Sequence, residues 1–217
     1  MLFRDEYLLA VDKPSGLLVH RGWGKDSVVL VDLVKEMLGV NVVHPLHRLD
    51  RGTSGVVLFA LDARTAGQMG AGFEDGSVKK HYLALVRGET QKEGVIDHSI
   101  PRREGGPRVE AKTDYRRLAI AQIEPRHVSW VEAFPLSGRL HQVRRHLKHI
   151  SHPVIGDANY GKGALNREMG ERWGLKRLAL HARSLSLTHP KTGEKIVFTS
   201  PIPPDLDEPL RRMGLSP

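Results

Sequence analysis

Cysteine is absent from this chain of 217 residues. Without a thiol, the protein forms no disulfide, performs no thiol chemistry and binds no metal through thiolates. No apolar run is long enough to cross a bilayer, and the N-terminus has none of the features of a signal peptide. We therefore expect a soluble cytoplasmic protein. Because no internal repeat and no linker rich in proline, glycine or serine divides the chain, we expect a single domain over residues 1–217.

Two common cofactor signatures are also missing. The chain contains neither a phosphate-binding Gly-Lys-Ser/Thr loop nor a glycine-rich dinucleotide fingerprint, so no nucleotide cofactor is expected. Positive charge, by contrast, is in excess. The 33 lysines and arginines against 25 acidic residues give a net charge of +8 and an isoelectric point near 9.9. This balance favours a polyanionic partner such as a nucleic acid, although it equally promotes solubility and loose contact with anionic membranes.

Several segments have the periodicity of strands or helices. Alternating or continuous apolar residues predict strands at residues 7–11, 56–61, 81–88, 128–136, 178–187 and 196–198. Helical spacing predicts helices that follow residue 27, that run from Asp62 to about Phe73, and that cover residues 140–150. The first of these helices would end at Gly39 and face the core with Leu30, Leu33, Val34, Met37 and Leu38. Strands with irregularly interspersed helices predict an α+β fold on a mixed, mostly antiparallel sheet.

The segment His47–Gly55 is the most informative part of the chain. Asp50 lies between Arg48 and Arg51 and is followed by a glycine-bounded turn and then by the apolar strand 56–61. A carboxylate at the rim of a sheet, among cations that keep it ionised, suits a nucleophile or the organiser of an anion site. The alternative is structural, with Asp50 capping the turn and pairing with an arginine. A serine nucleophile at Ser54 is disfavoured, because the hydrolase elbow leads into a helix and this turn leads into a strand.

A second segment is notable for having no acid at all. Between Ala133 and Gly156 the chain carries four histidines and the cations Arg139, Arg144, Arg145 and Lys148. On a helix, Arg144 would lie beside the apolar stripe, while Arg145 and Lys148 would point further out. The absence of counter-charges favours contact with phosphates over a merely solvated basic face. The histidine spacings place no clean pair on one helix face with a carboxylate nearby, so no metal site is expected.

Six segments together resemble the RluA-type pseudouridine synthases, in the order that this family has. The central one is His47–Gly55, which is similar to the catalytic motif. The others are residues 13–20, 80–86, 138–147, 152–157 and 177–182, so the resemblance spans about residues 5–200. It implies the pseudouridine synthase fold, with a central RNA-binding cleft, and an isomerase that converts uridine in RNA to pseudouridine. It implies no cofactor and no metal, since the base is detached, turned and rejoined without net gain or loss.

The resemblance also implies roles for individual residues. Asp50 would be the nucleophile, attacking either the sugar C1′ or the base C6, and Arg144 would pair with it and keep it ionised. Tyr82, otherwise an ordinary half-buried strand residue, would stack on the target base and is the candidate to accept the C5 proton. Arg48 would fill the gap left by the flipped uridine, and Leu180 would pack against the uracil. Further RNA contacts would come from Lys80, Arg51, Arg139, Arg145 and Lys148.

The RNA class follows less directly. Many relatives carry an N-terminal RNA-binding domain of the S4 type, whereas this chain begins directly with the catalytic core. That beginning, together with residues 18–23 and 174–178, resembles the tRNA-acting branch that modifies a T-arm uridine. The loop 102–112 and the C-terminal tail are shorter than in that branch. We therefore expect a monomeric enzyme acting on tRNA. The alternatives are a synthase for ribosomal RNA or for both RNAs, and a non-catalytic RNA-binding or chaperone protein.

Overall fold

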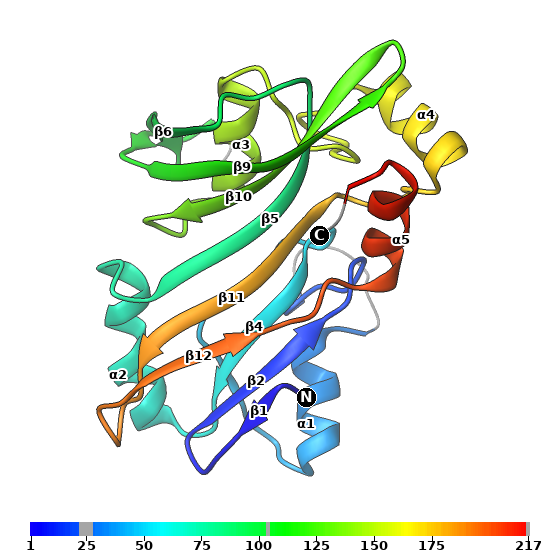
Figure 1. The fold of residues 1–217 in the computed structure, drawn as a ribbon. Coiled ribbons are helices and arrows are strands. Elements are labelled where there is room, and N and C mark those ends of the chain that lie inside the picture. The colour runs from blue at the N-terminus through cyan, green and yellow to red at the C-terminus, as the bar shows by residue number, and fades with distance from the viewer. Residues whose placement is uncertain (22–27, 103–104, 216–217) are drawn as a thin grey trace. The chain divides into compact units, whose positions relative to one another are not determined.

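A computed structural model describes the chain in three stretches, which are residues 1–21, 28–102 and 105–215 (Figure 1). The chain folds into two compact units that alternate along the sequence. Unit 1 comprises Met1–Val78 and Ala182–Pro201, and unit 2 comprises Lys79–His181 and Ile202–Pro217. That residues 1–217 act as one catalytic domain with a central RNA-binding cleft stays a prediction.

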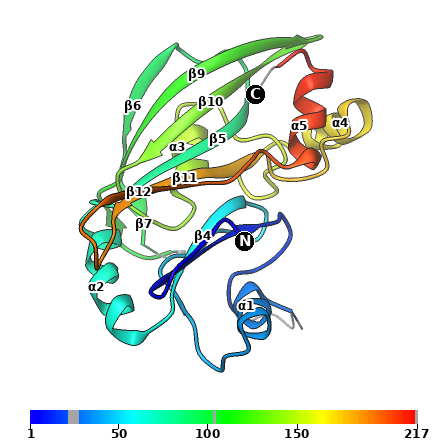
Figure 2. The ribbon, with the colours of Figure 1, turned by 60° about the horizontal axis from the view of Figure 1, so that its bottom comes forward.

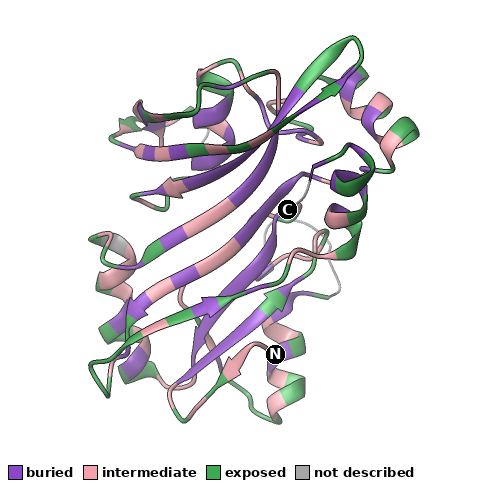
Figure 3. Ribbon diagram, in the orientation of Figure 1, coloured by how far each residue is buried: buried purple, intermediate pink, exposed green. Residues whose placement is uncertain are grey.

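Unit 1 consists of short antiparallel strands and two helices. Its elements are β1 (Phe3–Arg4), β2 (Leu8–Lys13), α1 (Leu30–Leu38), β3 (His44–Pro45), β4 (Ser54–Ala60), α2 (Ala63–Glu74), most of β11 (Leu180–Thr188) and β12 (Lys195–Thr199). Strand β4 pairs with β2 and β3, and β12 pairs with β11, all antiparallel. Every residue of β4 is buried (Figure 3), which explains its unbroken apolar sequence. The core of unit 1 contains Leu8, Val56, Leu58, Leu185 and Phe198.

Gly55, in the second position of β4, is required by close packing. Its φ of 116° lies in the region that favours glycine, and an added Cβ would collide with the backbone oxygen of Ala182 in β11. The last glycine of the segment His47–Gly55 thus lets two strands of unit 1 approach each other.

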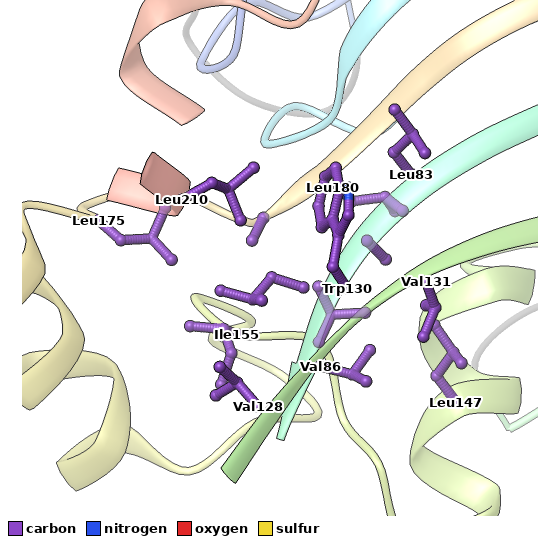
Figure 4. Packing of buried hydrophobic residues seen from close by; sticks show 14 of the residues in the cluster. Leu83, Val86, Val128, Trp130, Val131, Leu147, Ile155, Leu175, Leu180 and Leu210 are labelled. Atoms are coloured by element: carbon purple, nitrogen blue, oxygen red, sulfur yellow. The ribbon is translucent and has the colours of Figure 1, made fainter. Parts of the chain in front are cut away.

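Unit 2 is built on three long antiparallel strands and one short one. Its elements are β5 (Lys79–Arg87), β6 (Glu93–Asp97), β7 (Ile100–Pro101), β8 (Arg108–Val109), β9 (Lys112–Ile123), β10 (Arg126–Pro135), α3 (Gln142–His149), α4 (Gly163–Trp173) and α5 (Pro204–Arg212). The strand order is β5-β10-β9-β6, and β7 pairs with β8 separately. Helix α3 packs against β9 and β10, and α4 lies beside α5 in both views (Figures 1 and 2). The core is centred on the fully buried Trp130 (Figure 4).

The predicted α+β class with mostly antiparallel strands is confirmed, and most predicted elements are present. Two details were wrong. Leu33 and Met37 of α1 were expected to face the core but are 41% and 49% exposed, and only Leu30 and Val34 of the helix are buried. Helix α3 begins at Gln142 rather than residue 140, because His141 adopts a left-handed backbone with φ of 54°. Gly22 and Trp23, from the segment 18–23, lie outside the described residues. Within the described stretches no helix is long and apolar enough to span a membrane.

Candidate active site

The turn that carries Asp50 sits at the start of β4. Leu49 is buried while Asp50 is half-buried, and the flanking Arg48 and Arg51 are exposed. The backbone N–H of Thr53 donates to the Asp50 carbonyl oxygen at 3.1 Å, which closes the turn before β4 begins at Ser54. The expected placement of a carboxylate at the rim of a buried strand is therefore confirmed in unit 1.

The N-terminal segment Lys13–Gly16 clamps this turn through its backbone. Lys13 is fully buried, and its Nζ donates to the carbonyl oxygens of Pro14, Leu17 and Arg51 at 2.9, 2.7 and 3.2 Å. The Gly16 N–H also donates to the Arg51 oxygen at 2.8 Å, and the Ser15 hydroxyl donates to the Gly52 oxygen at 2.8 Å. An ammonium group has three N–H donors, so three carbonyls satisfy its hydrogen-bonding capacity. This segment belongs to the family resemblance described above, but the sequence alone assigned Lys13 no role.

Tyr82 and Lys80 lie two residues apart on β5 and so share one face of the strand. Tyr82 is half-buried, pairs with Ala133 of β10 and packs against the unit 2 core. Lys80 is 7% exposed. Burial lowers the pKa of Lys80, and the nearby positive charges of Arg139 and Lys79 lower it further. Lys80 is thus a cation that an approaching anion would stabilise.

Leu180 is only 3% exposed and belongs to the core that surrounds Trp130 (Figure 4). It opens β11, and the oxygen of the preceding Ala179 accepts the N–H of Leu85 from β5 at 3.0 Å. Its position in unit 2 is therefore fixed by neighbouring backbone as well as by packing.

Arg144 is buried on α3 and forms a two-pronged ion pair with Asp157. Its Nε donates to Oδ2 at 2.7 Å and its NH2 to Oδ1 at 2.9 Å. The Asp157 Oδ1 also accepts the backbone N–H groups of Asn159 and Tyr160, each at 2.9 Å. Burial alone would raise the pKa of the Asp157 carboxyl, but Arg144 and these N–H groups outweigh burial and hold that pKa below its ordinary value. The orientation of the Arg144 guanidinium is therefore set within unit 2.

The two other cations of α3 differ from Arg144 in exposure. Arg145 is half-buried and Lys148 is exposed, as the helical spacing predicted. Both lie near the ring of Tyr160 in the loop after α3. Asp157 and Tyr160 are the functional candidates that sequence reasoning missed. Asp157 did stand at the end of the segment 152–157, which was the available signal.

Each histidine of the acid-free segment has a partner of its own. His141 Nδ1 lies 2.9 Å from the Tyr160 hydroxyl, and His152 Nδ1 lies 2.8 Å from the Arg87 oxygen. His149 stacks on His98 with ring centroids 3.6 Å apart. His146 is fully buried, with Nδ1 2.8 Å from Thr113 Oγ1 and Nε2 2.9 Å from the His98 oxygen. Among the described residues, no three histidine, aspartate or glutamate side chains are arranged to hold a metal ion.

The burial of His146 predicts a loss of stability in mild acid. Burial is the main reason that its pKa is lowered; the hydrogen bond to the His98 backbone oxygen opposes the lowering, and the nearby imidazoles of His98 and His149 add to it. A histidine whose pKa is lowered by folding stabilises the fold fully above its unfolded pKa of about 6.5, and this stabilisation is lost as pH falls through the folded pKa. Urea unfolding between pH 8 and pH 5 should therefore show a steeper loss for the wild type than for His146→Gln. Parallel curves would contradict this expectation.

The comparisons with known proteins identify the family of the chain. The sequence profile of the RNA pseudouridylate synthase family matches residues 7–149, and the chain belongs to that family. Its resemblance to these synthases and its assignment as an enzyme of the isomerase class are confirmed.

Similar proteins cover almost the whole chain. A Haemophilus ducreyi protein named tRNA pseudouridine synthase C is 39% identical over 218 residues, which cover 92% of this chain and 89% of that protein. The Haemophilus influenzae protein of the same name is 36% identical over 233 residues, which cover 99% of this chain and 97% of that protein.

Solved structures confirm the fold. Human RNA pseudouridylate synthase domain containing 1 is 29% identical with a TM-score of 0.78, and the match covers 96% of this chain and 86% of that one. Human RNA pseudouridylate synthase domain containing 4 is 26% identical with a TM-score of 0.80, and the match covers 100% of this chain and 93% of that one. The predicted pseudouridine synthase fold is therefore present.

Proposed function

We propose that this protein converts a uridine of tRNA, in the T-arm, to pseudouridine. The observation that carries this proposal is the agreement, over 92% of the chain or more in the two relatives above, with proteins named tRNA pseudouridine synthase C. The net charge of +8 suits a polyanionic substrate. We propose further that the enzyme acts as a monomer in the cytoplasm.

Asp50 is the nucleophile of this reaction and Arg144 is its cationic partner. The clamp by Lys13–Gly16 supports the first role, because it fixes the turn that carries Asp50 through the main-chain oxygens of Arg51 and Gly52. The ion pair with Asp157 supports the second role, because it fixes the Arg144 guanidinium in one orientation. Fixing each of the two residues within its own unit suits a nucleophile that must meet one atom of the substrate.

Three further residues handle the flipped base. Tyr82 stacks on the uracil and is the candidate acceptor of the C5 proton, Leu180 packs against the ring, and Arg48 fills the gap left in the RNA. The exposure of Arg48 and the half-burial of Tyr82 are consistent with contact to RNA. Flipping costs a few kcal/mol of stacking, which the Arg48 contact and phosphate contacts offset. Those phosphate contacts come from Lys80, Arg51, Arg139, Arg145 and Lys148.

The reaction balances without a cofactor. The glycosidic bond between C1′ and N1 breaks, a bond between C1′ and C5 forms, the C5 proton leaves and N1 regains a proton. No electron is gained or lost, so acid–base groups and a nucleophile suffice.

Tritium release tests the proposal directly. Uridine labelled with tritium at C5 should lose its label to water when it is placed in unmodified tRNA and incubated with the enzyme. Release from ribosomal RNA alone would support the proposed isomerase activity but would identify ribosomal RNA, not tRNA, as the substrate. If both RNAs bind and neither releases tritium, the protein is a non-catalytic RNA-binding protein.

A further inference from the structure

The loop after α3 holds Tyr160 in a fixed position on the basic side of the helix. Tyr160 N–H donates to Asp157 Oδ1, and the Asn166 side chain bonds to the Gly156 N–H and to the Asp157 carbonyl oxygen at 2.9 and 3.0 Å. The Tyr160 hydroxyl accepts from Arg145 Nε at 2.7 Å and lies 2.9 Å from His141 Nδ1. Hydrogen bonds within the loop and to Asn166 of α4 therefore fix the loop, and the Tyr160 hydroxyl joins it to α3.

Three cations gather around the Tyr160 ring. The guanidinium carbons of Arg144 and Arg145 lie 5.1 and 5.6 Å from the ring centroid, and Lys148 Nζ lies 5.9 Å from it. The charge of Arg144 is compensated by Asp157. Among the described residues, neither Arg145 nor Lys148 forms an ion pair with a carboxylate. Within the described residues, two cations without a carboxylate partner thus lie next to one aromatic ring, which attracts each of them only weakly.

Arg145 keeps donors available for a ligand. Its Nε is bonded to Tyr160, and its NH1 donates to the Pro101 oxygen at 3.1 Å. A guanidinium has five N–H donors in a rigid fork, so three remain once these two bonds are made. Because Lys148 lies three residues further on the same helix, its ammonium group is a neighbour of that fork. Arg145 is half-buried and Lys148 is exposed, so an anion can reach both from solvent.

We propose that Tyr160 is the positioning residue of a phosphodiester site formed by Arg145 and Lys148, which takes one backbone phosphate of the substrate RNA. This inference rests on the proposed function for the identity of the RNA. The hydroxyl fixes the Arg145 fork, the ring lies against both cations, and the phosphate supplies the missing negative charge. The anchored phosphate then places the RNA relative to α3, on which Arg144 is also held.

The test compares Tyr160→Phe, Tyr160→Leu, Arg145→Ala and the Arg145→Ala/Lys148→Ala pair with the wild type, using unmodified tRNA transcript. We expect Tyr160→Phe to raise Kd and KM about threefold to tenfold, the worth of one typical hydrogen bond, and to leave kcat within twofold. Tyr160→Leu should raise both constants further. The double alanine variant should reduce the log–log salt slope of binding by about one unit, because both cations address one phosphate.

A double-mutant cycle distinguishes positioning from general loss of structure. In the Arg145→Ala background, Tyr160→Phe should add no further increase in Kd, because the hydroxyl acts through Arg145. Tyr7→Phe is the matched control, since Lys191 Nζ lies 5.0 Å from the Tyr7 ring centroid in unit 1. This control should leave Kd unchanged.

Two outcomes would overturn the site. One is an unchanged Kd in both Tyr160 variants, or an unchanged salt slope in the double alanine variant, and the other is a fall in kcat with KM unchanged in Tyr160→Phe. An inactive wild type would instead contradict the proposed function. The binding and salt measurements would still decide the phosphate site in that case, because they need no turnover.

Discussion

Asp50→Asn is expected to abolish pseudouridine formation while RNA affinity stays within a few-fold of the wild type. The amide has nearly the shape of the carboxylate but cannot act as the nucleophile. The turn should survive the substitution, since Lys13, Ser15 and Gly16 hold it through the carbonyl oxygens of Arg51 and Gly52. Tritium release under single-turnover conditions measures the loss, and filter binding measures the affinity.

The control for this variant is Asp32→Asn in the same unit. Asp32 pairs with Arg21 at 2.9 Å on the surface, where an ion pair contributes about 0–1 kcal/mol. Its release of tritium should equal that of the wild type. Pseudouridine formation by Asp50→Asn at more than a trace level would remove Asp50 from the role of nucleophile.

The placement of Asp50 could be predicted from the sequence because it is local. One short segment contains the acid, its flanking arginines, the turn and the strand, and their order alone places Asp50 at the rim of β4. The clamp could not be predicted in the same way. Lys13 reaches the Arg51 oxygen across 38 residues, and a lysine in a sequence gives no sign that it is buried against main-chain carbonyls. The pairing of Arg144 with Asp157 could not be predicted for a similar reason, since the sequence does not indicate which acid pairs with a given arginine.

The elements that sequence reasoning missed lack an apolar period. Strand β9 carries Asp114, Arg116 and Arg117, and it is a strand because β10 and β6 pair with it on both sides. Tertiary pairing outweighs local propensity there. Helix α5 contains Pro209 in its interior, which argues against a helix in isolation, yet it buries Leu206 and Leu210 in the unit 2 core. Helix α4 was missed because only Leu165 and Met169 of its residues are buried.

Asp157→Asn is expected to produce the largest loss of stability among single substitutions at this site. Arg144 and Asp157 have exposed side-chain fractions of only 9% and 0%, so the variant removes the buried carboxylate from this ion pair. Breaking a buried pair in this way costs about 3–5 kcal/mol. If Arg144 holds Asp50 ready for attack, tritium release should fall as well. Urea unfolding at pH 7 measures the first effect.

The dependence on pH separates the charge of Asp157 from its shape. Because folding lowers the pKa of Asp157, its contribution is fully present above the unfolded pKa of about 3.9 and is lost as pH falls through the folded pKa. The stability difference between wild type and Asp157→Asn should therefore shrink as pH falls below about 4. The double variant Arg144→Met/Asp157→Asn should regain much of the stability at pH 7, since both charges of this buried ion pair are removed together, yet remain inactive because Arg144 is absent. A pH-independent difference, or a double variant as unstable as the single one, would show that Asp157 acts through its hydrogen bonds to the loop backbone and not through its charge.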